Sequence, residues 1–195
     1  MAINLKKGQR ISLTKESPGL TRLLCGLCWD VAKKGLFGMG GKDFDLDCSV
    51  LCLDANDKVR DISNVVYYAN LRHPSGAITH LGDNLTGEGE GDDEQILVDL
   101  PLVPADIVRL IFTVNIYNSV QRKQDFGQVS NASVRLVNTG NNQEIASYHL
   151  SGAEYQGMTG MIIAEVYRHD NEWKVAAVGD GFRVKGLEEL VQKYK

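Results

Sequence analysis

At 195 residues the chain is long enough for one domain or two small ones, and its 43% hydrophobic content can fill a core. The formal net charge of −4 at pH 7 gives no support to a broad basic surface, so no nucleic-acid partner is expected. No apolar run approaches the roughly 20 residues of a membrane helix, and the N-terminal MAINLKKGQRISL lacks the apolar segment of a secretory signal. We therefore expect a cytoplasmic location, where the four cysteines stay reduced.

Short apolar runs recur along the chain, and turn-forming residues separate them. Runs of this kind predict β-strands. In chain order the predicted strands are Leu23–Trp29, Leu46–Leu53, Val65–Ala69, Ile78–Leu81, Ile96–Leu100, Ile107–Ile116, Ala132–Val137, Ile145–Leu150, Met161–Tyr167 and Trp173–Val178. Many short strands at this spacing predict a mainly β fold, either a sandwich or a barrel.

The C-terminal segment GLEELVQKYK is the clearest helix signal. Leu187, Leu190, Val191 and Tyr194 recur at the spacing of one helix face, and Gly186 precedes them. No internal repeat and no low-complexity linker divides the chain. We therefore expect a single domain over residues 1–195.

The stretch GDNLTGEGEGDDE, which begins at Gly82, is the most informative part of the sequence. It contains no Lys or Arg, and its six carboxylates are Asp83, Glu88, Glu90, Asp92, Asp93 and Glu94. The glycines between them free the backbone, so that carbonyl groups can turn inward together with the side chains. Calcium, which takes about six to eight oxygen ligands, would neutralise the repulsion between these charges. The other interpretation is a solvated charge run, but this one continues directly into the strand-like QILVDL.

A second acidic segment, Asp43, Asp45 and Asp47, leads into a predicted buried strand. Alternate spacing on an extended chain places the three side chains on one face. An EF-hand is excluded, because its sixth position requires glycine and is Cys48, and its twelfth requires glutamate and is Asp54. We expect this segment to meet the 83–94 stretch at one end of the fold and to share a metal ion with it.

The cysteines and two histidines have simpler interpretations than a metal or catalytic site. Cys25 and Cys28 would face opposite sides of a strand, and the pair Cys48 and Cys52 has the wrong spacing for a zinc ribbon. Buried free thiols are the expected role, although a thiol function in redox chemistry stays open. His73 and His80 precede the acidic stretch without an accompanying nucleophile motif, and solvent-exposed turn histidines are expected there.

Several longer motifs resemble the TerD family of tellurium-resistance and stress proteins. They are DFDLDCSVLCLDANDKV, HLGDNLTGEGEGDDEQILVDL, PADIVRLIFTVNIY, QDFGQVSNASVRLVN and EVYRHDNEWKVAAVGDGF, and the resemblance runs over almost the whole chain. It implies a two-sheet β-sandwich with acidic metal-binding loops at one end and a short C-terminal helix. The family is linked to tellurite resistance, phage inhibition and stress tolerance, is encoded with other Ter proteins including a membrane partner, and has no catalysis firmly attached to it.

The resemblance also implies a set of calcium ligands. Carried over position by position, the implied metal site consists of Asp45, Asp47, Asp83, Asn84, Glu88, Glu90, Asp92, Asp93 and Glu94. Backbone carbonyls within residues 85–91 would add further oxygens. Asn115 at the end of a predicted strand could supply an amide oxygen, but a hydrogen bond within the sheet is the expected role.

Three functions compete at this point. The first is a noncatalytic calcium-binding protein whose ordered loops present a surface to other Ter-family proteins, to a membrane-bound complex through a partner, or to a second copy of the chain. The second is a metal-dependent phosphohydrolase-type enzyme that uses the carboxylate cluster. The third, calcium-bridged docking on lipid, is the least favoured, because Leu85 is the only large apolar residue in the 83–94 stretch.

Overall fold

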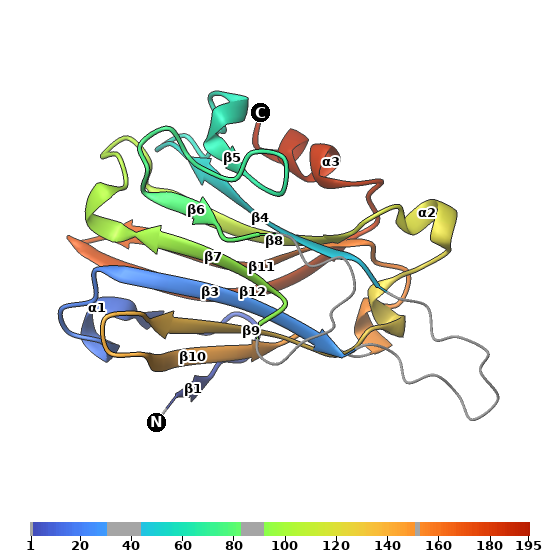
Figure 1. Ribbon diagram of the computed structural model, residues 1–195, viewed down its shortest axis with the longest axis horizontal. Coiled ribbons are helices and arrows are strands. Elements are labelled where there is room, and N and C mark those ends of the chain that lie inside the picture. The colour runs from blue at the N-terminus through green and yellow to red at the C-terminus, as the bar shows by residue number, and fades with distance from the viewer. Residues whose placement is uncertain (1, 31–43, 83–91, 151–152) are drawn as a thin grey trace.

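The computed structural model describes residues 2–30, 44–82, 92–150 and 153–195, and these form two β-sheets that face each other (Figure 1). Sheet A has the strand order β1-β10-β9-β3-β7-β6, and sheet B has the order β2-β12-β11-β8-β4-β5. The strands of sheet A are β1 (Ile3–Asn4), β10 (Gln143–His149), β9 (Ser130–Asn138), β3 (Arg22–Asp30), β7 (Glu94–Asp99) and β6 (Ile78–His80). Those of sheet B are β2 (Arg10–Ser12), β12 (Glu172–Phe182), β11 (Gly160–His169), β8 (Arg109–Ile116), β4 (Leu46–Leu53) and β5 (Val65–Val66).

The order of the strands in each sheet differs from their order in the chain. In sheet A, β3 lies between β9 and β7, and in sheet B, β8 lies between β11 and β4. Neighbouring strands are antiparallel, except that β1 runs parallel to β10. In sheet A, β7 lies next to the edge strand β6, and in sheet B, β4 lies next to the edge strand β5. Because these two edges are on the same side of the sandwich, the acidic segments at the starts of β4 and β7 come near each other.

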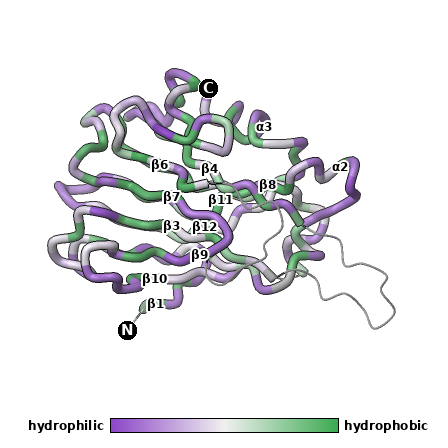
Figure 2. Tube along the Cα trace, viewed as in Figure 1, coloured by the Kyte–Doolittle hydropathy of each residue, from purple (hydrophilic) through white to green (hydrophobic). Residues whose placement is uncertain are grey.

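Alternation of apolar and polar residues produces the core between the sheets. In β4 the side chains of Leu46, Cys48 and Val50 belong to this core, so the residues between them face the other way. Figure 2 shows the same alternation as hydrophobic segments that recur along the strands. The largest fully buried side chains include Phe112 of β8 and Phe126.

A smaller apolar cluster covers the outer face of sheet B. It joins Leu51 of β4 and Ile111 of β8 to Val191 of the C-terminal helix α3 (Leu187–Val191). The stripe predicted for this helix therefore packs on a sheet, and a 3₁₀ turn, η5 (Gln192–Tyr194), follows it. Four further short helical segments surround the sandwich: α1 (Leu13–Glu16), η1 (Ile62–Asn64), η2 (Leu100–Leu102) and α2 (Ser119–Arg122). Two more are η3 (Phe126–Gln128) and η4 (Ala153–Tyr155).

The predicted mainly β fold with two sheets and a short C-terminal helix is confirmed, and each predicted strand has a counterpart. The turn that connects β11 to β12 has positive φ angles of 50° at Asp170 and 61° at Asn171. Positive φ at both central residues is typical of tight hairpin turns, and asparagine and aspartate tolerate it. The short strands β1 and β2 and the helix α1 were not predicted, because segments of two to four residues carry no visible periodicity.

Candidate functional site

Asp45 and Asp47 lie at the start of β4 on the outer face of sheet B, and both side chains are buried. They share this face because the alternate residues Leu46 and Cys48 point into the core. The Arg122 Nη2 atom of α2 lies 3.6 Å from Asp45 Oδ2. The guanidinium group of Arg122 thus lies next to a carboxylate that the sequence predicts to bind a metal ion.

Asn115 of β8 is the direct neighbour of Asp47 in the sheet register. Its Nδ2 donates to Asp47 Oδ2 over 3.1 Å. A carboxylate only accepts hydrogen bonds, so the Asn115 atom that contacts Asp47 must be the donor Nδ2. The other polar atom of the Asn115 amide is therefore the acceptor Oδ1. Within the described residues this Oδ1 is buried and has no hydrogen-bond partner, although the residue is only 4% exposed. An unsatisfied buried acceptor is costly unless something with positive charge or a donor occupies the adjacent space.

A cavity of about 710 Å³ opens next to Asp47 and Asn115, between sheet B and α3. Tyr68 and Tyr117 line it with their rings edge to face, 6.5 Å apart. These two side chains are 43% and 40% exposed, which is unusual for large aromatic groups. The buried acceptors therefore lie beside an accessible aromatic surface.

Glu94, the first residue of β7, points between the two sheets and is 1% exposed. Its Oε2 accepts a hydrogen bond from the backbone N–H of Cys48 in β4 and lies 3.7 Å from Nε2 of His80. This contact brings the starts of β7 and β4 together, as the sequence predicts for the two acidic segments. It also places Glu94 on the inner side of sheet B, whereas Asp45 and Asp47 lie on the outer side.

Asp92 lies on the outer face of sheet A, above Gly26 of β3. Its Oδ1 accepts from Arg135 Nε over 2.5 Å and its Oδ2 from Arg135 Nη2 over 3.0 Å. Hydrogen bonding to Asp92 raises the pKa of Arg135. The neighbouring Asp93 accepts from the backbone N–H of Trp29 through Oδ2, over 2.9 Å. Both Asp92 and Asp93 thus accept hydrogen bonds from other residues of the protein.

The remaining predicted ligands, Asp83, Asn84, Glu88 and Glu90, lie outside the described residues. Across residues 2–30, 44–82, 92–150 and 153–195 no three His, Cys, Asp or Glu side chains are grouped closely enough to hold a metal ion. The acidic residues that are described occupy three places instead: the outer face of sheet B, the space between the sheets, and the outer face of sheet A. The shared metal site stays a prediction.

The histidine expectation was wrong, because His73 and His80 are both buried. His73 Nδ1 lies 2.8 Å from Ser75 Oγ and its Nε2 lies 3.1 Å from Asn64 Oδ1, while burial lowers the pKa of this ring. A histidine in a turn can be buried when polar groups of the fold form hydrogen bonds with its ring, as Ser75 and Asn64 do for His73. Sequence reasoning also missed Arg122 and Arg135, whose spacing from the acidic segments gives no signal.

The cysteines face the sides that a strand predicts: Cys25, Cys48 and Cys52 are buried, and Cys28 is half-buried. Burial raises the pKa of Cys52 to about 12 and raises the pKa values of Cys25 and Cys48 well above the usual range. Because the thiolate is the reactive form, these three thiols should be inert at neutral pH. The Sγ atom of Cys28 lies 3.1 Å from Ser133 Oγ on the outer side of β3.

Ellman's reagent is therefore expected to modify one thiol of the native protein within minutes and the other three after denaturation. Cys28→Ser should abolish the fast reaction and leave the slow thiols unchanged. Fast modification of two or more thiols in the native protein would contradict this assignment and would reopen a redox role for the buried cysteines.

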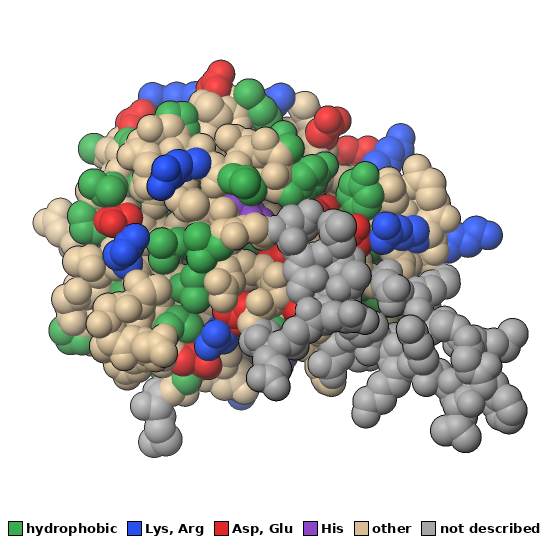
Figure 3. All heavy atoms as spheres, viewed as in Figure 1, with side chains coloured by type: hydrophobic (Ala, Val, Ile, Leu, Met, Phe, Trp, Pro, Cys, Tyr) green, Lys and Arg blue, Asp and Glu red, His purple; other side chains and the backbone are tan. Residues whose placement is uncertain are grey.

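The surface carries no sign of a basic face on the side seen in Figure 3, where blue and red side chains are scattered among each other. Among the described residues, no helix has the length and apolar character needed to cross a bilayer.

The similarity to known proteins covers all or most of the chain. The model of the TerD domain matches residues 1–194 of the chain. Stress response protein SCP2 of Bacillus subtilis (strain 168) is 48% identical, over 100% of both chains. Tellurium resistance protein TerD of Serratia marcescens is 43% identical, over 100% of this chain and 97% of that one. The crystal structure of a homologue of telluride resistance protein (TerD) from Streptomyces coelicolor A3(2) matches with a TM-score of 0.65 and 23% identity, covering 85% of this chain and 92% of that chain.

Proposed function

Because this chain belongs to the TerD family of tellurium-resistance and stress-response proteins, we propose that it is a noncatalytic calcium-binding protein of such a system. In this proposal the acidic segments bind calcium, and the ordered segments form a surface for a partner. The observation that carries it is the buried Oδ1 of Asn115 beside the carboxylate of Asp47.

The donor set has the chemistry that calcium requires. Asp45, Asp47 and Asn115 offer carboxylate and amide oxygens on one face of sheet B, and calcium binds oxygen ligands of these kinds. A calcium ion there would be coordinated by Asn115 Oδ1 and would replace Arg122 as the positive charge next to Asp45. The other ligands in the proposal are Asp83, Asn84, Glu88, Glu90, Asp92, Asp93 and Glu94, of which Asp92 and Glu94 would have to leave Arg135 and the Cys48 N–H to join this ion.

The proposed calcium ion acts by removing repulsion. Residues 82–94 contain six carboxylates and no basic group, so a bound divalent cation stabilises every conformation that brings them together. An ion that binds only the folded protein also raises its stability, by about 2.7 kcal/mol at a free concentration one hundred times the Kd.

The proposed partner surface adjoins the same residues. Tyr117 follows β8, and its backbone N–H donates to the Asp45 carbonyl over 2.9 Å. Its ring and that of Tyr68 are accessible, and aromatic side chains of this kind are enriched where proteins meet. We propose that the partner is another Ter-family protein, a membrane-bound complex reached through such a protein, or a second copy of this chain. A cytoplasmic location belongs to the same proposal.

Calorimetric titration of calcium into metal-stripped protein tests this function, with magnesium as the comparison ion. We expect micromolar or tighter calcium binding, and Asp45→Asn should weaken it by about tenfold or more because a charged ligand is lost. Asp180→Asn is the matched control, since it removes the same charge from an exposed residue that pairs with Lys7 over 2.7 Å.

A chelator should lower the melting temperature of the wild-type protein and leave that of Asp45→Asn nearly unchanged. Absence of calcium binding in the wild-type protein, or equal binding in Asp45→Asn, would reject the proposed site.

A further inference from the structure

Three polar side chains on the outer face of sheet B are buried near the C-terminal end of the chain. They are Ser49 of β4 and Thr113 and Asn115 of β8, and their exposed fractions are 0%, 0% and 4%. Ser49 is the direct neighbour of Thr113 in the sheet register, and Asn115 is the next residue on the same face of β8. These three residues, the polar strip, thus form one continuous patch. In the described parts of the chain, Ser49 Oγ, Thr113 Oγ1 and Asn115 Oδ1 have no hydrogen-bond partner.

The helix α3, which belongs to the C-terminal segment of residues 186–195, packs on the same face of sheet B (Figure 1). Val191 of α3 belongs to one apolar cluster with Leu51 and Ile111. Leu51 and Ile111 are direct neighbours in β4 and β8, and they form the next pair beyond the polar strip. One side of α3 is therefore anchored directly next to the strip.

A second contact of α3 lies at the opposite end of the polar strip. Leu190 is 0% exposed, and a Cβ at Gly160 of β11 would lie 3.3 Å from Leu190 Cδ1. Leu190 thus fills space that a side chain at residue 160 would take. Gly160 is the direct neighbour of Asn115 in the sheet register. The helix therefore bridges the strip from one end to the other and shields it from solvent.

The polar strip weakens the attachment of α3 to the sheet. A buried hydroxyl or amide oxygen that has lost its water and gained no other partner destabilises the state that buries it. A cavity of about 710 Å³ also remains between α3 and the sheet, next to Tyr67, Asn115 and Leu187, so the apolar contacts there are incomplete. Detachment of α3 would hydrate all three polar atoms at once.

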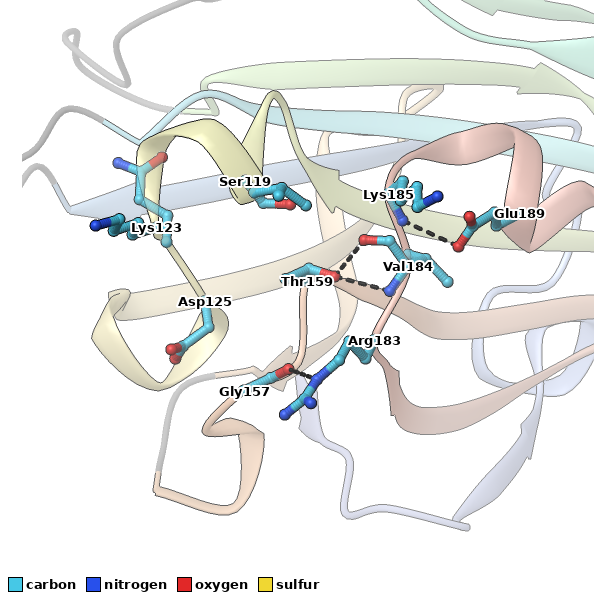
Figure 4. A pocket seen from close by; sticks show the side chains of 11 residues that line it. Ser119, Lys123, Asp125, Gly157, Thr159, Arg183, Val184, Lys185 and Glu189 are labelled. Carbon is cyan, nitrogen blue, oxygen red and sulfur yellow. Dashed lines mark hydrogen bonds between the residues drawn. The ribbon is translucent and has the colours of Figure 1, made fainter.

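The C-terminal segment has a hinge at its start and a fastening point at its end. Just before it, the hydroxyl of Thr159 accepts from the N–H of Val184 over 2.8 Å and donates to its carbonyl over 2.5 Å (Figure 4). Gly186 follows, and a Cβ there would have nothing within 4 Å. At the far end, the N–H of Val59 donates to the carbonyl of Tyr194 over 2.7 Å. Movement can therefore begin at Gly186, and it breaks the contact between Val59 and Tyr194.

We propose that residues 186–195 form a lid that opens as a unit and exposes the polar strip. The closed lid keeps Asn115 Oδ1 away from solvent, and the open lid makes it accessible together with the hydroxyls of Ser49 and Thr113. The lid would thus control access to an oxygen of the proposed calcium site, and in this respect the inference rests on the proposed function. The opening itself requires no calcium.

Amide hydrogen exchange, followed by NMR on metal-stripped protein in the presence of a chelator, tests the opening. Two probes lie on different segments: the N–H of Val59, which donates to Tyr194, and the N–H of Gln192, which donates to the carbonyl of Glu188. A helix of five residues is not stable alone, so both N–H groups lose their partners when the lid opens. We expect equal protection factors for the two, at least about a hundredfold below those of the β8 amides.

Three variants identify the cause of the opening. Thr113→Val keeps the shape of the side chain and removes the hydroxyl without a partner, so the protection factors of both probes should rise by about tenfold. Thr79→Val is the matched control, because it makes the same replacement in β6 of sheet A, and it should leave both unchanged. Val191→Ala removes apolar contact between lid and sheet and should lower both by about tenfold.

Protection of Val59 and Gln192 equal to that of β8 would overturn the proposal, because the segment would then be released only when the whole protein unfolds. Unequal protection of the two probes, or a rise in Thr113→Val that is confined to β8, would overturn it as well. Since the exchange measurements contain no calcium, their failure and the failure of the calcium titration are independent results.

Discussion

Replacement of Glu94 by alanine is expected to lower the free energy of unfolding by about 3 kcal/mol. Glu94 of sheet A accepts from the backbone N–H of Cys48 in sheet B, and it is 1% exposed. Alanine would leave this N–H and the ring of His80 in a buried space without the carboxylate. Urea denaturation, followed by tryptophan fluorescence, measures the change in unfolding free energy.

Glu94→Gln separates the loss of the acceptor from the loss of the charge. Glutamine fills nearly the same volume and its amide oxygen can accept from Cys48, so the expected loss is smaller, about 1 kcal/mol. Glu16→Ala, at an exposed residue of α1, is the control and should change stability by less than about 0.5 kcal/mol. Equal losses in Glu94→Ala and Glu94→Gln would show that the contact with Cys48 contributes little.

Gly26→Ala is expected to destabilise the protein by about 2 kcal/mol, although alanine suits a strand better than glycine does. A Cβ at residue 26 would lie 2.1 Å from Asp92 Oδ2 and 2.2 Å from Asp92 Cγ, closer than atoms can approach. The carboxylate would have to move and would lose its paired contacts with Arg135, at 2.5 and 3.0 Å. The same denaturation measurement detects this loss.

A double-mutant cycle with Asp92→Ala identifies the cause. Once the carboxylate is removed, the Cβ has room, and Gly26→Ala should be neutral or slightly stabilising in that background. Additive effects of the two substitutions would mean that the loss in Gly26→Ala does not come from the collision with Asp92. The cycle also separates a structural role of Asp92 from calcium binding, because it needs no metal ion.

The strands were predictable because their signal is local. Alternating or continuous apolar runs mark a strand wherever it lies, so β4 and β8, which are buried on both faces, were found with their bounds nearly correct. The same period of two correctly placed Asp45 and Asp47 on one face of β4. The stripe of Leu187, Val191 and Tyr194 likewise predicted α3 and its buried side.

The environment of each acidic residue was not predictable, because it depends on partners far away in the sequence. Asp92 pairs with Arg135, 43 positions further on, and Glu94 contacts Cys48, 46 positions earlier. Such contacts arise only after the order of the strands is fixed, and no local pattern encodes that order. His80 was expected in solvent for the same reason, since its neighbour Glu94 comes from another strand.

By itself, then, the sequence determined which segments are extended, which face of each is apolar, and that negative charge accumulates at the starts of β4 and β7. Only the tertiary structure decided that these charges are divided between the outer faces of the two sheets and the space between them. It also decided that Asn115 presents, within the described residues, an unsatisfied oxygen beside Asp47. The physical reason is that periodicity depends on neighbours along the chain, whereas hydrogen bonding and charge pairing depend on neighbours in space.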